Sequence, residues 1–143
     1  MTVLVDTGVL YAAHDTDASR HETAVEALDA VYDGQYGQPF LSDYIYDEVV
    51  TLTARRSGDW DVATTVGQKL RGAGTFPTVY EFLWVSESEF SAAVDVFERY
   101  DDQRLSFTDA STIALVDRHE IHQVLSFDDD FDGLVDRLAP ESL

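Results

Sequence analysis

Four acidic residues occupy positions from which their carboxylates could share a divalent metal ion. Asp6 and Asp128 each directly follow an expected strand, whereas Glu48 and Asp109 lie in expected helices. If the four side chains meet, their charges repel one another at neutral pH unless cations neutralise them. Carboxylates in a chain without cysteine select Mg²⁺ or Mn²⁺, which keep several waters for chemistry. These residue types therefore point to a hard-metal site.

The elements that must position these acids follow from the hydrophobic pattern. Short apolar runs alternate with stretches of helical period, which predicts a single α/β domain over 1–143, with a mainly parallel sheet of four to five strands flanked by helices. The expected strands are 2–5, 39–41, 78–85, 122–127 and a short edge strand around 133–137. The expected helices are 8–13, 19–32, 43–56, 60–71, 86–100 and 107–119, with Ser42 or Asp43 capping the third.

The four acids are expected at one edge of this sheet. Ligands of an open parallel sheet gather outside the carboxyl ends of its strands, where Asp6 and Asp128 stand. Asp109 continues the apolar stripe of its helix and should face inward, while Glu48 borders a stripe from which Asp47 points away. Each acid alone could be an ordinary helix cap or solvated side chain. Their convergence favours a metal site.

Composition narrows the class of protein. The 143 residues suit one domain, and 45% hydrophobic content argues against disorder despite a net charge of −19. Lys69 is the only lysine, and such an acidic, lysine-poor chain resembles proteins from a high-salt cytoplasm; a salt titration of folding tests this. No apolar run approaches the roughly 18 residues of a membrane helix, so we expect a soluble, cytoplasmic protein without a membrane partner.

Four sequence blocks together carry a resemblance to a known family. They are Val-Leu-Val-Asp-Thr at 3–7, Glu-Val-Val-Thr-Leu at 48–52, Leu-Ser-Phe-Thr-Asp-Ala at 105–110 and Val-Leu-Ser-Phe-Asp-Asp-Asp-Phe at 124–131. In order and spacing they resemble the PIN-domain ribonucleases, in particular VapC-type toxins of toxin–antitoxin pairs. The resemblance runs from the first residue to about Asp132.

The resemblance implies a small parallel α/β fold and a Mg²⁺- or Mn²⁺-dependent endoribonuclease that cleaves structured RNA, such as tRNA or rRNA, leaving 5′-phosphate and 3′-hydroxyl ends. It also implies a homodimer and a VapB-like antitoxin. Carried over block by block, the metal-site acids are Asp6, Glu48, Asp109 and Asp128, with Asp130 a further candidate. Thr7 fits the hydroxyl that usually follows the first acid, whereas Gly8 replaces the serine often found next.

The net charge opposes RNA binding, because affinity for the backbone usually comes from Lys and Arg. Bridging cations and local arginines must compensate. The candidates for RNA contact are Arg55, Arg56, Arg99 and Arg104. A favourable charge at a helix C-terminus explains such arginines about equally well.

Other functions remain open at this stage. Asp128, Asp130, Asp132 and Gly133 match the first half of an EF-hand calcium loop, but Ala139 stands where a bidentate Glu is needed. An aspartyl-phosphate phosphatase would need a second acid at the position of Gly8, and a receiver domain would need a lysine near the last strands. A binding module without catalysis is the third alternative. Trp60 and Trp84 are expected in the core or in a dimer interface.

Overall fold

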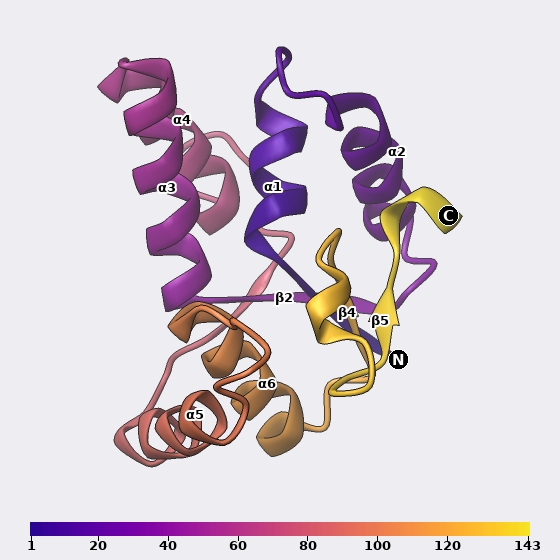
Figure 1. Cartoon of the computed structure of the whole chain (residues 1–143). Coiled ribbons are helices and arrows are strands. Elements are labelled where there is room, and N and C mark those ends of the chain that lie inside the picture. The colour runs from indigo at the N-terminus through magenta and orange to yellow at the C-terminus, as the bar shows by residue number, and fades with distance from the viewer.

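Five parallel strands form one sheet in the order β3-β2-β1-β4-β5 in a computed structural model that describes residues 1–143 (Figure 1). The strands are β1 Thr2–Val5, β2 Gln38–Ser42, β3 Glu81–Leu83, β4 Gln123–Leu125 and β5 Arg137–Leu138. The helices are α1 Thr7–His14, α2 His21–Tyr32, α3 Asp43–Ser57, α4 Trp60–Arg71, α5 Glu87–Arg99 and α6 Phe107–His119, with the short 3₁₀ turns η1 Asp129–Phe131 and η2 Pro140–Ser142. The predicted single α/β domain with a parallel sheet is therefore confirmed in its architecture.

Strand β1 is the centre of the sheet and brings the two ends of the chain together. Its Leu4 pairs with Phe40 of β2, and its Val5 pairs with Leu125 of β4. Val3, Leu4 and Val5 are fully buried, as expected for a parallel strand covered on both faces. The residues that follow β1 and β4 consequently emerge next to each other at the same edge.

Two hydrophobic cores hold the helices in place. The larger core joins β1 to apolar residues of α1 to α4, among them Leu10, Leu28, Ile45 and Leu70. A small second core is built by Leu105, Ile113 and Phe131, between α6 and the turn that follows β4. In Figure 1, α1 to α4 lie above the strands and α5 and α6 lie below them.

Local capping explains where the helices near the sheet edge begin. The Ser42 hydroxyl accepts the amide of Ile45 and so caps α3, whereas Asp43 accepts the amide of Val85 across the sheet. Of the two predicted caps, Ser42 is the one used. The glycine Gly58 ends α3 with a φ of 65°, a left-handed conformation that favours glycine.

Three details of the predicted elements differ from the structure. The strand expected at 78–85 is reduced to β3, because the edge strand can pair only with Phe40 to Ser42 of the short strand β2. The strand expected at 122–127 ends at Leu125, and the edge strand expected around 133–137 forms at β5, displaced towards the C-terminus. Trp60 and Trp84 are 78% and 68% exposed, so of their two expected places the core is wrong and the dimer interface stays a prediction. None of the helices combines the length and apolar character that a membrane crossing requires.

Candidate metal-binding cleft

An open cleft of about 610 Å³ lies at the carboxyl edge of the sheet. All four predicted acids line it. Its lining residues are Asp6, Thr7, Gly8, Arg20, Glu48, Ser106, Asp109, Phe127, Asp128 and Asp129. Strand ends and first helical turns that are far apart in the chain therefore meet here, as the rule for parallel sheets predicts.

Asp6 is the most deeply buried acid of the cleft, with 7% of its surface exposed. The hydroxyl of Ser126 donates a hydrogen bond of 2.6 Å to its Oδ2. Burial raises the pKa of Asp6 to about 7, the Ser126 hydrogen bond acts in the opposite direction, and the charges of Asp109 and Glu48 add to the rise. Without a cation, ionisation of this carboxyl group is costly at neutral pH.

Asp109 combines a structural role with a place on the cleft wall. Ser106 and Asp109 form a capping box at the start of α6, in which Asp109 Oδ2 accepts the Ser106 amide at 3.1 Å and Ser106 Oγ accepts the Asp109 amide at 3.0 Å. Burial raises the pKa of Asp109, the bonds from Ser106 oppose this, and the charges of Asp128 and Glu48 raise it further. Only Oδ2 is used by the cap, so Oδ1 is available to a ligand.

Glu48 reaches the cleft from the third helix. It is half-buried and lines the cleft, whereas its neighbour Asp47 is exposed and accepts a hydrogen bond from Thr51. The border position that the helical period predicts for Glu48 is thus the position it occupies.

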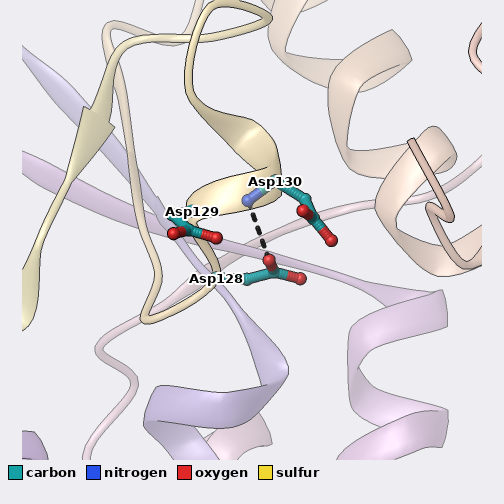
Figure 2. Close-up of side chains that lie close together, drawn as sticks. All are labelled: Asp128, Asp129 and Asp130. Atoms are coloured by element: carbon teal, nitrogen blue, oxygen red, sulfur yellow. Dashed lines mark hydrogen bonds between the residues drawn. The ribbon is translucent and has the colours of Figure 1, made fainter. Parts of the chain in front are cut away.

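The three consecutive acids after β4 form a tight cluster at the mouth of the cleft. Oxygens of Asp128, Asp129 and Asp130 lie within 4.8 Å of one another. Figure 2 shows Asp129 and Asp130 on either side of Asp128, whose Oδ1 accepts the Asp130 amide at 2.9 Å. Asp128 and Asp129 line the cleft but Asp130 does not. The charge of Asp128 raises the pKa of the exposed Asp130, and the opposing charge of Arg104 is too weak to cancel this rise.

Thr7 supplies a second, independent indication of a ligand. Its Oγ1 is the one buried side-chain polar atom of the chain without a hydrogen-bond partner, and Thr7 lines the cleft. Native proteins rarely leave a buried hydroxyl unpaired unless water, an ion or a substrate completes it. Gly8 beside it has open space where a side chain would stand, so the serine that the resemblance led us to expect is replaced by a gap.

The basic residues of the cleft differ from those that the sequence suggested. Arg55 and Arg56 lie outside the cleft lining, and the guanidinium of Arg56 stacks on Tyr11. Arg104 is also outside the lining, although its charge reaches Asp130 and lowers the pKa of that acid against the larger opposing effects. Arg20 is the basic residue that lines the cleft.

Sequence reasoning missed Ser126 and Arg20. Ser126 could have been found, because the pairing of Val5 with Leu125 makes the next residues, Asp6 and Ser126, neighbours. Arg20 could not have been found in this way, because it contacts Phe127, which is far from it in the sequence and is not linked to it by any local pattern.

The calcium-loop alternative does not fit the local geometry. A strand, β4, precedes the loop where an EF-hand needs a helix. Both carboxylate oxygens of Asp132 are bound by Arg137, at 2.6 and 3.2 Å. The acid that an EF-hand would use as its third ligand is therefore engaged within the chain.

The residues present fit a hard divalent cation. The donors are carboxylate and hydroxyl oxygens, the set that Mg²⁺ and Mn²⁺ prefer. Burial and neighbouring carboxylates raise the pKa values of Asp6 and Asp109, and neither acid forms a salt bridge with a basic side chain. The unpartnered Thr7 hydroxyl adds a donor and acceptor that the fold does not use.

Comparison with known proteins agrees with the fold and the motifs. The family model described as "PIN domain" matches residues 3–136. Ribonuclease VapC26 of Mycobacterium tuberculosis is 27% identical over 126 residues, which is 88% of this chain and 86% of the relative. The crystal structure of VapC20 from the same species, described as a sarcin-ricin loop cleaving toxin, superposes with a TM-score of 0.77 at 26% identity and covers 90% of this chain and 92% of VapC20.

A more distant structure supports the fold alone. FitAcB from Neisseria gonorrhoeae superposes with a TM-score of 0.69 at 16% identity over 99% of both chains. The match of the family model over nearly the whole length, together with the acids that line the cleft, leads to one conclusion: this chain belongs to the PIN domain family.

Proposed function

We propose that this chain is a Mg²⁺- or Mn²⁺-dependent endoribonuclease that acts as the toxin of a toxin–antitoxin pair and cleaves structured RNA. The observation that carries the proposal is the cleft in which Asp6, Glu48, Asp109 and Asp128 meet without a salt bridge to any basic side chain of the protein. Similarity to VapC26, a ribonuclease, and to VapC20, a sarcin-ricin loop cleaving toxin, supports RNA as the substrate.

The proposed division of labour follows from the surroundings of each acid. Asp6 and Asp109, whose pKa values are raised, would be the primary metal ligands, since a cation relieves the cost of their ionisation. Glu48 and Asp128 would hold a second ion or orient water. Bound among these oxygens, Mg²⁺ or Mn²⁺ would acidify a water molecule and neutralise charge that develops on the phosphate.

Two hydroxyl groups would assist the acids. Ser126 donates to Asp6 Oδ2 and accepts the amide of Asp128 at 3.0 Å, so it fixes two walls of the cleft relative to each other. The free hydroxyl of Thr7 is positioned to donate to an oxygen of the substrate or of bound water. Asp130, outside the lining, would shape the mouth of the cleft and not hold the metal.

The proposal includes protein partners. Among the solved structures with this fold are a toxin–antitoxin complex from Klebsiella pneumoniae and VapBC2 from Rickettsia felis, which supports a VapB-like antitoxin for this chain. Exposed aromatic side chains support a homodimer or another protein interface; they are Trp60, Trp84, Phe90 and Phe97. A substrate of tRNA or rRNA would place the activity in the cytoplasm.

The direct test is cleavage of total RNA by the purified chain. We expect cleavage with Mg²⁺ or Mn²⁺, none with a chelator, and products whose new ends are 5′-phosphate and 3′-hydroxyl. Asp6→Asn should abolish cleavage, because it keeps the shape of the side chain but removes a ligand charge. Asp117→Asn removes one charge from an exposed position of α6 outside the cleft and should cleave normally. Metal-independent cleavage, or full activity of Asp6→Asn, would contradict the proposal, and absence of cleavage would favour a binding module.

A further inference from the structure

Arg20 lies in surroundings that are otherwise acidic. Apart from it, the charged residues that line the cleft are Asp6, Glu48, Asp109, Asp128 and Asp129. The two close ion pairs of the chain join Glu89 to His119 and Asp132 to Arg137, so Arg20 pairs with none of these acids. Arg20 shares the cleft with five carboxylates and binds none of them. Another group must therefore fix the position of its guanidinium.

The aromatic ring of Phe127 holds the guanidinium. The Cζ atom of Arg20 lies 4.8 Å from the centroid of this ring, and Phe127 is the residue directly before Asp128. A cation over a ring face is attracted by the electrons of the ring and uses none of its N–H groups. The backbone carbonyl of Arg20 accepts the amide of Ala24, but its side chain makes no hydrogen bond within the chain, so the five N–H donors of the guanidinium remain available in the cleft.

A structural role does not account for this arginine. Arg20 is the residue before the first turn of α2, and its side chain makes no capping hydrogen bond. A positive charge at a helix N-terminus is disfavoured by the helix dipole, which favours cations at the opposite end. The side chain is exposed and contributes nothing to either hydrophobic core. Neither capping nor core packing therefore explains the position of Arg20, which favours a role in binding a ligand.

We propose that Arg20 binds a backbone phosphate of the RNA in the cleft and positions it next to the acids. This inference rests on the proposed ribonuclease function and names a substrate-binding residue for it. The planar fork of a guanidinium matches two oxygens of a phosphate, and stacking on Phe127 orients the fork before the substrate arrives. In a chain with a net charge of −19, which opposes RNA binding, a cation oriented at the site supplies an attractive contact to the phosphate.

The test measures binding of a fluorescent synthetic RNA stem-loop in the presence of Mg²⁺. All variants carry Asp6→Asn, so that the RNA stays intact. We expect Arg20→Gln to weaken binding roughly tenfold, as loss of a charge-assisted contact does. The slope of log Kd against log salt should fall by about one. Arg20→Lys keeps the charge but loses the fork of N–H donors. Its RNA affinity should lie between that of the protein with Arg20 and that of Arg20→Gln.

Two comparisons separate a local contact from a general effect of charge. Arg118→Gln makes the same charge change at an exposed position of α6 outside the cleft and should leave affinity and salt slope nearly unchanged. Phe127→Leu should weaken binding when Arg20 is present and have little further effect in Arg20→Gln, because the ring acts through the arginine. Equal thermal midpoints show that Arg20→Gln folds normally.

The outcomes distinguish the inference from the function on which it rests. If the unmodified chain cleaves RNA while Arg20→Gln and Arg118→Gln bind it equally well, Arg20 does not contact the phosphate and the inference is overturned alone. If no variant binds RNA and the unmodified chain does not cleave it, the proposed function and the inference both fail.

Discussion

Helices α5 and α6 begin with the same hydrogen-bonded cap, yet the acids in these caps lie in opposite electrostatic environments. In α5, Ser86 and Glu89 exchange side-chain and backbone hydrogen bonds. Glu89 is buried, with 7% of its surface exposed, but the ring of His119 lies 2.6 Å from its Oε2. Burial alone would raise the pKa of Glu89; the Ser86 amide and His119 outweigh it and lower the pKa.

In α6, the equivalent acid Asp109 has no such partner and forms no salt bridge with a basic side chain. Asp109 makes the same bonds to Ser106, but its pKa is raised by burial and by the charges of Asp128 and Glu48 despite these bonds. The backbone cap is thus common to both acids, and the difference comes from the groups that face them. Glu89 is paired within the fold, whereas Asp109 is left without a basic partner, as the proposed metal site requires.

The largest expected effect is a difference in RNA cleavage between variants of the two capping acids. Asp109→Asn can still accept the Ser106 amide but loses a ligand charge, so we expect RNA cleavage to fall by at least about a hundredfold. Glu89→Gln should retain cleavage, because Glu89 is absent from the cleft lining. Initial cleavage rates at saturating Mg²⁺ measure both. If both variants lost cleavage to a similar extent, the distinction between a cleft acid, Asp109, and a purely structural acid, Glu89, would be wrong.

The second effect concerns stability and pH in the absence of metal. The pKa of Asp6 is about 7 in the folded chain against an ordinary 3.8, so the folded state binds more protons between these values and its stability falls as pH rises through this window. Asp6→Asn avoids this loss. At pH 8 its free energy of unfolding should exceed that of the unmodified chain by up to roughly 4 kcal/mol. Below about pH 4 the stabilisation should disappear.

Denaturant unfolding with a chelator at several pH values measures this difference. Saturating Mn²⁺ at 100 times its Kd should restore about 2.7 kcal/mol to the unmodified chain and much less to Asp6→Asn. A pH-independent difference between the two proteins would show that charge at Asp6 is not the cause.

The smallest effect tests the caps themselves. Ser86→Ala and Ser106→Ala each remove a side-chain acceptor at a helix start and should each lower the free energy of unfolding by about 1 kcal/mol. Only Ser106→Ala should also weaken Mn²⁺ binding, because Ser106 restrains Asp109 and lines the cleft. Equal Mn²⁺ affinities, measured by calorimetry, would mean that the cap does not position the acid.

The sequence predicted the positions of the acids better than their surroundings. Strand ends and helical period were sufficient to place Asp6, Glu48, Asp109 and Asp128 at one edge, because both signals are local. Their roles as metal ligands remain predictions. Helix boundaries also followed from local caps and glycines, such as Ser42 and the glycine after α3.

Features that depend on contacts between distant segments could not be predicted in the same way. The length of β3 depends on its pairing with Phe40 to Ser42 of β2. The contact of Arg20 with Phe127 joins the start of α2 to the turn after β4. Trp60 and Trp84 are exposed, although large aromatic residues are usually buried in a monomer. In each case the sequence contains the residues but not the neighbour that decides their environment.

The bond between Ser126 and Asp6 joins residues that are 120 positions apart, and β4 pairs directly with β1. The last wall of the cleft, Phe127 to Asp129, therefore comes from a segment that follows all the other lining residues in the chain. Until that segment packs beside β1, Asp6 lacks its hydroxyl donor Ser126 and the carboxylates of Asp128 and Asp129, whereas Glu48 and Asp109 come earlier in the chain. The proposed metal site is therefore complete only after β4 has paired with β1, so the proposed ribonuclease activity requires this pairing of distant segments.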